Sequence, residues 1–176
     1  SPVTAECYIS NGLPGFDIVG LPDAAVKEAR ERVRAAAKNS GFAFPVGRIT
    51  VNLAPANVRK AGSQYDLPIA LSILCSAGAV RKPSERSAFL GELSLDGSVR
   101  PVAGVLPMAL AAKREGIRFL FVPAENAAEA VLARGPEVYA IENLKQIGES
   151  LNGSVKAEPV REIPGEEPLD GLLDFA

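Results

Sequence analysis

The chain has 176 residues, of which 47% are hydrophobic and 23% charged, and its 19 basic and 21 acidic side chains give a net charge of -2. This length and composition fit one globular domain, and no apolar run approaches the roughly 18 residues that span a bilayer, so we expect no membrane partner. The balanced charge gives no electrostatic indication of a nucleic-acid partner. Because histidine is absent, histidine-based triads, histidine metal sites and imidazole acid-base chemistry are excluded.

The two cysteines, Cys7 and Cys75, are too few for a disulfide framework and too far apart in sequence for a CxxC motif. We expect two buried, reduced thiols. The first residues have neither the basic nor the apolar region of a signal peptide, which predicts a cytoplasmic protein. The chain begins without Met and directly with a strand pattern, so we interpret it as a fragment of a longer protein.

Three strands are predicted in the first part of the chain. Residues 3–9 and 16–20 have strand patterns, and the turn-forming residues 10–15 between them favour an N-terminal β-hairpin. Residues 48–54 alternate strictly between apolar and polar side chains, which predicts a half-buried strand.

Two helices are predicted in the same part. Asp23 is expected to cap an amphipathic helix that ends at Gly41. After a polar loop over residues 55–65, Asp66 is expected to cap a second helix that ends at Gly78. This second helix is apolar on nearly all sides, so it should be a central, buried helix.

The second half of the chain alternates strands and helices, which predicts β-α-β units with parallel pairing. Residues 88–95 form a strand, and Asp96-Gly97 indicates a tight hairpin of type I′ with a return strand to about residue 102. Further helices are expected over residues 108–115, 125–133 and 144–151, and further strands over residues 118–122 and 137–141. The predicted fold class is therefore α/β (α+β).

Residues 156–176 differ in composition from the rest, with three prolines, two glycines and six acidic against two basic residues, as is typical of a linker. The predicted organisation is one domain over residues 1–155, with 17 basic and 15 acidic residues, followed by this acidic linker.

Few motifs in the sequence support chemistry. There is no GxxxxGK[ST] phosphate loop, no GxGxxG after a strand and no metal-binding motif, so we expect no cofactor and no metal in this chain. One enzymatic possibility is a serine nucleophile activated by lysine, which needs no histidine. Ser63 lies near Lys60, but a turn serine beside an exposed lysine explains the same residues.

The stretches at residues 88–104, 111–117 and 122–126 closely resemble the end of the proteolytic domain of Lon. The resemblance implies a Lon-like fold, in which a Gly-Pro-Ser-Ala-Gly segment carries the nucleophile and a lysine follows a paired-glycine motif. Matching the two sequences puts Gln64 at the nucleophile and Leu106 at the lysine. Neither side chain can perform that chemistry, so the resemblance implies no catalytic residue here.

Residues 10–23, 48–56 and 66–71 resemble the N-terminal domain of the magnesium chelatase-like ComM/YifB family, and the resemblance covers about residues 3–155. In that family this domain precedes an AAA+ ATPase module, which binds ATP and Mg and forms hexameric rings. Members of the competence branch drive DNA branch migration during natural transformation. The resemblance implies a non-catalytic accessory domain whose partners are its own C-terminal AAA+ domain, further copies of itself and DNA.

If this domain contacts DNA, the best candidates from the sequence are Arg48, Arg59 and Lys60, because basic residues around a loop can bind phosphates without base specificity. Two alternatives remain open. The first is a serine-lysine peptidase that uses Ser63 one position away from the expected register. The second is a protein-protein docking module with no nucleic-acid role.

Overall fold

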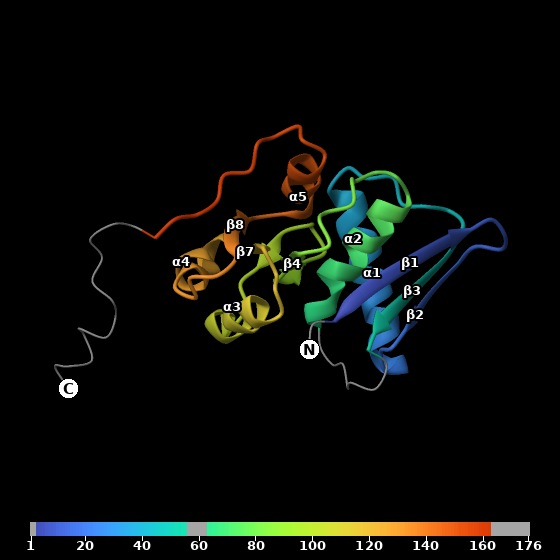
Figure 1. Cartoon of the computed structure of the whole chain (residues 1–176). Helices are drawn as coiled ribbons and strands as arrows, with labels where there is room; N and C mark the ends of the chain where they lie inside the picture. Colours follow the sequence, from blue (N-terminus) through green and yellow to red (C-terminus); the bar gives the residue numbers. More distant parts are fainter. Residues whose placement is uncertain (1–2, 56–62, 163–176) are drawn as a thin grey trace.

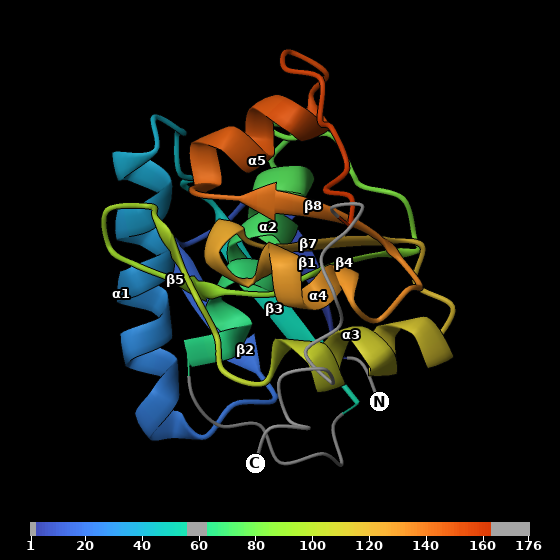
Figure 2. The ribbon, with the colours of Figure 1, turned by 90° about the vertical axis from the view of Figure 1, so that its left-hand side faces the viewer.

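The computed structural model describes residues 3–55 and 63–162 and has an α/β fold built on two three-stranded sheets, shown in Figures 1 and 2. The predicted fold class is confirmed. The first sheet contains β1 (Thr4–Ser10), β2 (Gly15–Val19) and β3 (Arg48–Ala54). The second contains β4 (Ser87–Phe89), β7 (Phe119–Pro123) and β8 (Glu137–Ile141).

The first sheet has the order β1-β3-β2, so the predicted N-terminal hairpin is wrong. β1 pairs with β3 in antiparallel orientation, and β2 pairs with β3 in parallel orientation, with the helix α1 (Asp23–Asn39) as the crossover between them. β3 has the strictest alternation, and its Ile49, Val51 and Leu53 are all buried. β3 therefore takes the central position, where both of its edges are paired. It separates β1 from β2, the two strands of the predicted hairpin.

The helix α2 (Asp66–Ser76) lies in the middle of the domain, as its apolar sequence predicts. Its Leu67, Ile69 and Leu74 have no exposed surface and join the hydrophobic cluster that also contains β3 and the inner face of α1. The predicted N-caps are wrong, because Pro22 and Tyr65 occupy those positions and neither caps through its side chain. Asp23 and Asp66 are instead the first residues of their helices, where a carboxylate interacts favourably with the positive end of the helix dipole.

The second half has the predicted β-α-β organisation, with the order β4-β7-β8 and parallel pairing throughout. Helix α3 (Val105–Arg114) precedes β7, the 3₁₀ turn η2 (Ala124–Asn126) and helix α4 (Ala127–Val131) connect β7 to β8, and helix α5 (Leu144–Leu151) follows β8.

The predicted strand over residues 88–95 is interrupted at Gly91, whose φ is 140°, and continues as β5 (Glu92–Leu93). β5 pairs with β6 (Val99–Arg100) in the predicted hairpin. Its turn is not type I′, because Gly97 has a positive φ and Asp96, among the described residues, does not. Instead, the Asp96 carboxylate accepts hydrogen bonds from the Ser98 backbone N–H and hydroxyl, and these bonds hold the pKa of Asp96 below its usual value.

β7 joins the two halves of the molecule because side chains from both of its faces are buried. On one face, Phe121 stacks between Phe89 of β4 and Tyr139 of β8, with ring centroids 4.5 and 5.1 Å apart, and this row packs on the cluster around α2. On the other face, Leu120 and Val122 form a second cluster with α3 and α4. The alternation of β7 thus places one cluster on each side of the second sheet.

The C-terminal residues 156–162 of the described chain run beside β8. Val160 forms an isolated antiparallel bridge with Val138, and Arg134 pairs with Glu162 at 3.2 Å. The boundary between residues 155 and 156 stays a prediction, and residues 163–176 lie outside the described part.

The structure bears on two expectations from the sequence, which concern membrane-spanning segments and the two cysteines. In the described ranges, no helix is both long and apolar enough to cross a membrane. Cys7 and Cys75 are free thiols, as expected, but each is only half-buried. Burial still raises the pKa of both.

Asn126 connects η2 to the segment before α3. Its side-chain amide accepts a hydrogen bond from the Val102 N–H at 2.9 Å and donates one to the Val102 carbonyl at 3.0 Å, and the residue is 8% exposed. Asn152 makes the same kind of double contact, with the Arg81 N–H and the Ala79 carbonyl, but it is less buried.

We therefore predict that Asn126→Leu lowers the free energy of unfolding by ~2–3 kcal/mol, because it leaves both polar groups of Val102 without a partner in a nearly dry environment. Asn152→Leu is the matched control and should cost less than half as much, because water can replace its contacts. Urea unfolding of both variants measures the difference. Equal costs would contradict the role given to burial.

Candidate functional site

The turn η1 (Ser63–Tyr65) leads into α2 and carries the residues that the sequence places at or near the Lon nucleophile. Gln64 is exposed and Ser63 is half-buried. Neither side chain forms a hydrogen bond with another residue of the described ranges. The amide of Gln64 has no ionisable group, and the hydroxyl of Ser63 has no described base beside it.

Leu106, which the sequence match pairs with the Lon lysine, is the second residue of α3. Its side chain is half-buried against the cluster formed by Leu120 and Val122, and its N–H donates to a Glu129 carboxylate oxygen at 3.4 Å. Its surroundings are those of a packed aliphatic residue.

A lysine that acts as a base must be desolvated so that its neutral form is populated. Every lysine in the described part of the chain is exposed, and these are Lys27, Lys38, Lys82, Lys113, Lys145 and Lys156. Lys60, the lysine nearest to Ser63 in sequence, lies outside the described residues.

Asp66, the first residue of α2, forms a buried ion pair that the sequence analysis did not predict. Asp66 is 1% exposed, and its carboxylate accepts a hydrogen bond from the Arg32 guanidinium at 2.5 Å. Arg32 is also 3.6 Å from Glu28, one turn earlier on α1. The ion pair connects the middle of α1 to the start of α2 and so holds η1 in place.

Burial is the main influence on Asp66 and raises the pKa of its carboxyl, while the hydrogen bond and charge of Arg32 oppose that rise. The same hydrogen bond raises the pKa of Arg32. The charges of Glu92 and Glu28 add to the rise in the pKa of Asp66, and Arg32 is the side chain that forms a hydrogen bond with its carboxylate, an arrangement that serves structure.

Of the three residues proposed from the sequence for DNA binding, Arg48 lies within the described structure. Arg48 is the first residue of β3, and its guanidinium pairs with the Asp17 carboxylate of β2 at 2.6 Å, with both side chains about half exposed. Its charge is therefore largely neutralised within the sheet. Arg59 and Lys60 lie outside the described residues, so their role stays a prediction.

A larger basic cluster lies at the edge of the second sheet where its parallel strands begin. Helices that connect parallel strands run in the opposite direction, so α3 and α4 both end at this edge. The Phe119 N–H donates to the Arg86 carbonyl and the Glu137 N–H to the Arg118 carbonyl, which places these two arginines directly before the adjacent strands β4 and β7. We call the cluster the basic edge, and it consists of Arg81, Lys82, Arg86, Lys113, Arg114, Arg118 and Arg134.

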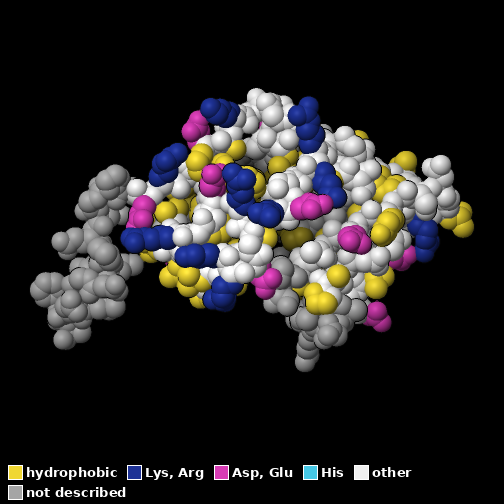
Figure 3. All heavy atoms as spheres, viewed as in Figure 1, with side chains coloured by type: hydrophobic (Ala, Val, Ile, Leu, Met, Phe, Trp, Pro, Cys, Tyr) yellow, Lys and Arg dark blue, Asp and Glu magenta, His cyan; other side chains and the backbone are white. Residues whose placement is uncertain are grey.

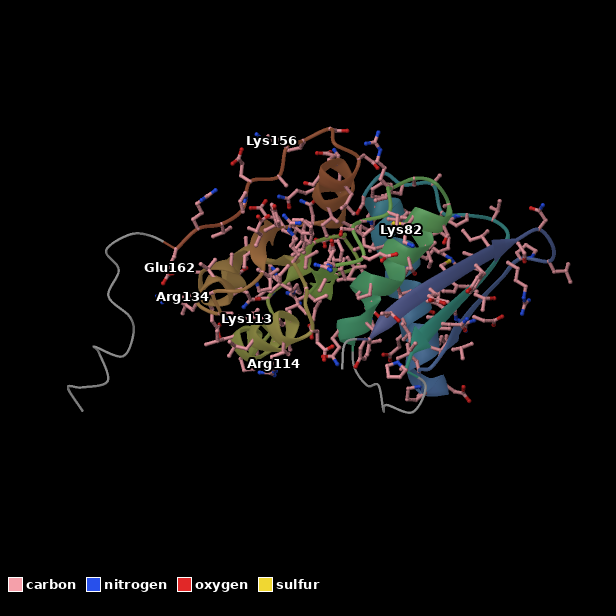
Figure 4. All side chains as sticks on the ribbon, viewed as in Figure 1. Lys82, Lys113, Arg114, Arg134, Lys156 and Glu162 are labelled. Atoms are coloured by element: carbon pink, nitrogen blue, oxygen red, sulfur yellow. The ribbon has the colours of Figure 1, made fainter. Side chains whose placement is uncertain are left out.

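Figure 3 shows Lys and Arg side chains spread over the half of the molecule that contains the second sheet and its helices. Figure 4 shows that the labelled members of the cluster come from the segment after α2, the end of α3 and the turn after α4. No single run of sequence reveals the cluster. The signal that could have found it is the repeated position of Lys and Arg just before each parallel strand.

No group of three or more Cys, Asp or Glu side chains within the described ranges could hold a metal ion. The sequence also has no phosphate loop for a nucleotide.

The chain belongs to the magnesium chelatase-like family, because its residues 5–126 match the family described as subunit ChlI of Mg-chelatase. It is 49% identical to protein Rv2897c of Mycobacterium tuberculosis over 155 residues, which are 86% of this chain and 30% of that protein. It is 44% identical to YifB of Salmonella typhimurium over 153 residues, which are 86% of this chain and 30% of that protein.

It is also 42% identical over 169 residues to the competence protein ComM of Haemophilus influenzae, covering 96% of this chain and 33% of ComM. The predicted ComM/YifB relationship is confirmed. The chain thus spans about a third of the length of these relatives.

A more distant similarity is to the Lon protease of Roseiflexus castenholzii, at 36% identity over 104 residues, 59% of this chain and 13% of that protease. The match agrees with the Lon-like fold expected from the sequence.

The buried ion pair gives a prediction with a defined pH dependence. Arg32→Met leaves Asp66 without its counter-charge, and we expect a loss of ~3 kcal/mol in the free energy of unfolding at pH 7. The variant raises the pKa of Asp66 further, so the native state binds its proton more tightly than the unfolded state does. Stability is then retained below the ordinary pKa of Asp and lost as the pH rises through the raised value.

Urea unfolding at pH 4 and pH 7 tests this, and the deficit of Arg32→Met should be larger at pH 7. The double variant Arg32→Met with Asp66→Asn removes the buried charge and should regain most of the loss at pH 7. A deficit of the same size at both pH values would show that the carboxylate is not the source of the cost.

Proposed function

We propose that this chain is an accessory domain, without peptidase activity of its own, of a magnesium chelatase-like AAA+ ATPase that engages DNA. The observation that carries the proposal is the pair of residues at the two Lon dyad positions. The sequence match with Lon puts an amide, Gln64, at the position of the nucleophile and an aliphatic side chain, Leu106, at the position of the base.

The exposed lysines support this reading. Proton transfer from a serine requires a base within hydrogen-bond reach and with a suitable pKa, and a lysine in water stays protonated at neutral pH. Ser63 has no hydrogen bond to any described lysine, and the described lysines are all on the surface. The Lon-like scaffold is therefore available for binding or assembly.

The rest of the proposal comes from the relatives. They are about three times as long as this chain, and the family resemblance implies that the additional length contains the ATPase, its ATP and Mg sites and the hexamer contacts. One relative is named a competence protein, which favours a role in DNA recombination and branch migration. In this view the domain supports ring assembly, DNA engagement, or both.

The peptidase alternative is tested with a fluorophosphonate probe and with unfolded casein. We expect neither labelling nor cleavage by the chain, and Ser63→Ala should behave as the wild type does. Labelling of the wild type that Ser63→Ala abolishes would establish a serine hydrolase and end the proposal.

The accessory role is tested by comparing the whole protein with a variant that lacks residues 1–155. The whole protein should hydrolyse ATP faster when DNA is added and should form rings with ATP. The deletion should weaken ring formation or DNA stimulation by at least tenfold, measured by mass photometry and a coupled ATPase assay. If the deletion changes neither property, the domain has no part in assembly or DNA engagement.

A further inference from the structure

We infer that the basic edge binds the phosphate backbone of a nucleic acid. This inference rests on the proposed function, since it supposes that the domain engages DNA, and it names a surface different from the one predicted at Arg48, Arg59 and Lys60. The segments 81–86, 113–118 and 134–137 carry seven basic and three acidic side chains, although the chain as a whole has a net charge of -2. Positive charge is therefore concentrated on one edge.

The basic side chains of this edge are exposed and mostly unpaired. Within the described part of the chain, only Arg134 of the seven has a carboxylate partner, Glu162. Elsewhere in the described chain, Arg32 pairs with Asp66, Arg48 with Asp17 and Lys145 with Glu149. Seven like charges on one edge repel one another, and a polyanion relieves that repulsion.

The backbone at Arg134 is a second, independent observation. Arg134 has a φ of 51°, and it is the one residue other than glycine with a positive φ among those described. Glycine or asparagine is favoured where a chain leaves a helix in this conformation, because a larger side chain is strained there. An arginine that occupies such a position, with Gly135 directly after it, is typical of a functional requirement for its side chain.

Lys113 shows how the edge is held together. Its aliphatic stem lies over Gly135, where an added Cβ would come within 2.7 Å of it, and its ammonium group donates to the Ala133 carbonyl at 3.3 Å. The end of α3 is thus packed on the turn after α4. Lys113 therefore lies beside the turn that carries Arg134.

The composition of the edge favours a phosphate backbone over an acidic protein. Protein interfaces have a buried apolar centre rich in large side chains, but none of the exposed large hydrophobic side chains of the described residues lies in the three segments of the edge. Arginine is also more frequent than lysine here, and its planar guanidinium suits phosphate oxygens. Contacts of this kind bind without reading base sequence.

The test measures binding of the chain to a 30-nucleotide single strand and to a 30-base-pair duplex by fluorescence anisotropy at 50, 100 and 200 mM KCl. The test variant combines Arg86→Gln, Arg114→Gln and Arg118→Gln. We expect at least a tenfold loss of affinity at 50 mM KCl and a salt dependence that is shallower by about two units, because three phosphate contacts are removed.

The matched control combines Lys27→Gln, Lys38→Gln and Lys145→Gln, which removes the same charge from exposed positions on α1 and α5. Its affinity should stay within twofold of the wild type. Arg118 packs on the Phe119 ring, 5.3 Å from its centroid. A second test variant therefore keeps Arg118 and combines Arg86→Gln and Arg114→Gln with Lys82→Gln. It should lose affinity to a similar degree without disturbing that contact.

Equal losses in the test and control variants would show that only net charge matters and would overturn the inference. The same holds if the wild-type chain binds neither DNA at 50 mM KCl, or binds polyglutamate more tightly than DNA, which would indicate an acidic protein partner. If the whole protein is stimulated by DNA and the test variants bind DNA as the wild type does, the basic edge is refuted while the proposed function stands.

Discussion

Strand β7 must be buried on both of its faces, and the arrangement of the other elements depends on this constraint. Phe121 faces the cluster around α2, while Leu120 and Val122 face α3 and α4, so a shift of one residue would exchange the two sets. β7 also pairs in parallel on both sides, which requires crossover helices that return to the start of the sheet. The end of α3 carries Lys113 and Arg114, and the turn after α4 carries Arg134. The same strand thus determines where the core lies and where charge gathers.

Charge has two separate uses in this molecule. Asp66 is withdrawn from water, and its ion pair with Arg32 connects two helices. The role of this pair is therefore structural. The basic edge is the reverse case, with cations that are exposed and lack carboxylate partners apart from Arg134 among the described residues.

The success of sequence-based prediction followed how local each signal was. The alternation over residues 48–54 and the helical period over residues 144–151 matched the structure to the residue, because both are set by near neighbours. The pairing of β1 with β3 was missed because strand order depends on segments far apart in sequence. Asp66 was predicted only as a helix cap, and its ion pair was missed because the partner, Arg32, lies 34 residues away in the sequence. The basic edge was missed for the same reason, since its members meet only in the folded chain.

The contact between Glu162 and Arg134 makes the basic edge partly self-occupied. The bridge from Val160 to Val138 holds the carboxylate of Glu162 beside the guanidinium, so this internal anion competes at an effective concentration in the millimolar range, however dilute the protein is. An external ligand must displace it, and phosphates that outnumber one carboxylate can do so. Because both side chains of this pair are partly exposed, a ligand with several closely spaced phosphates has the advantage in replacing Glu162 at Arg134.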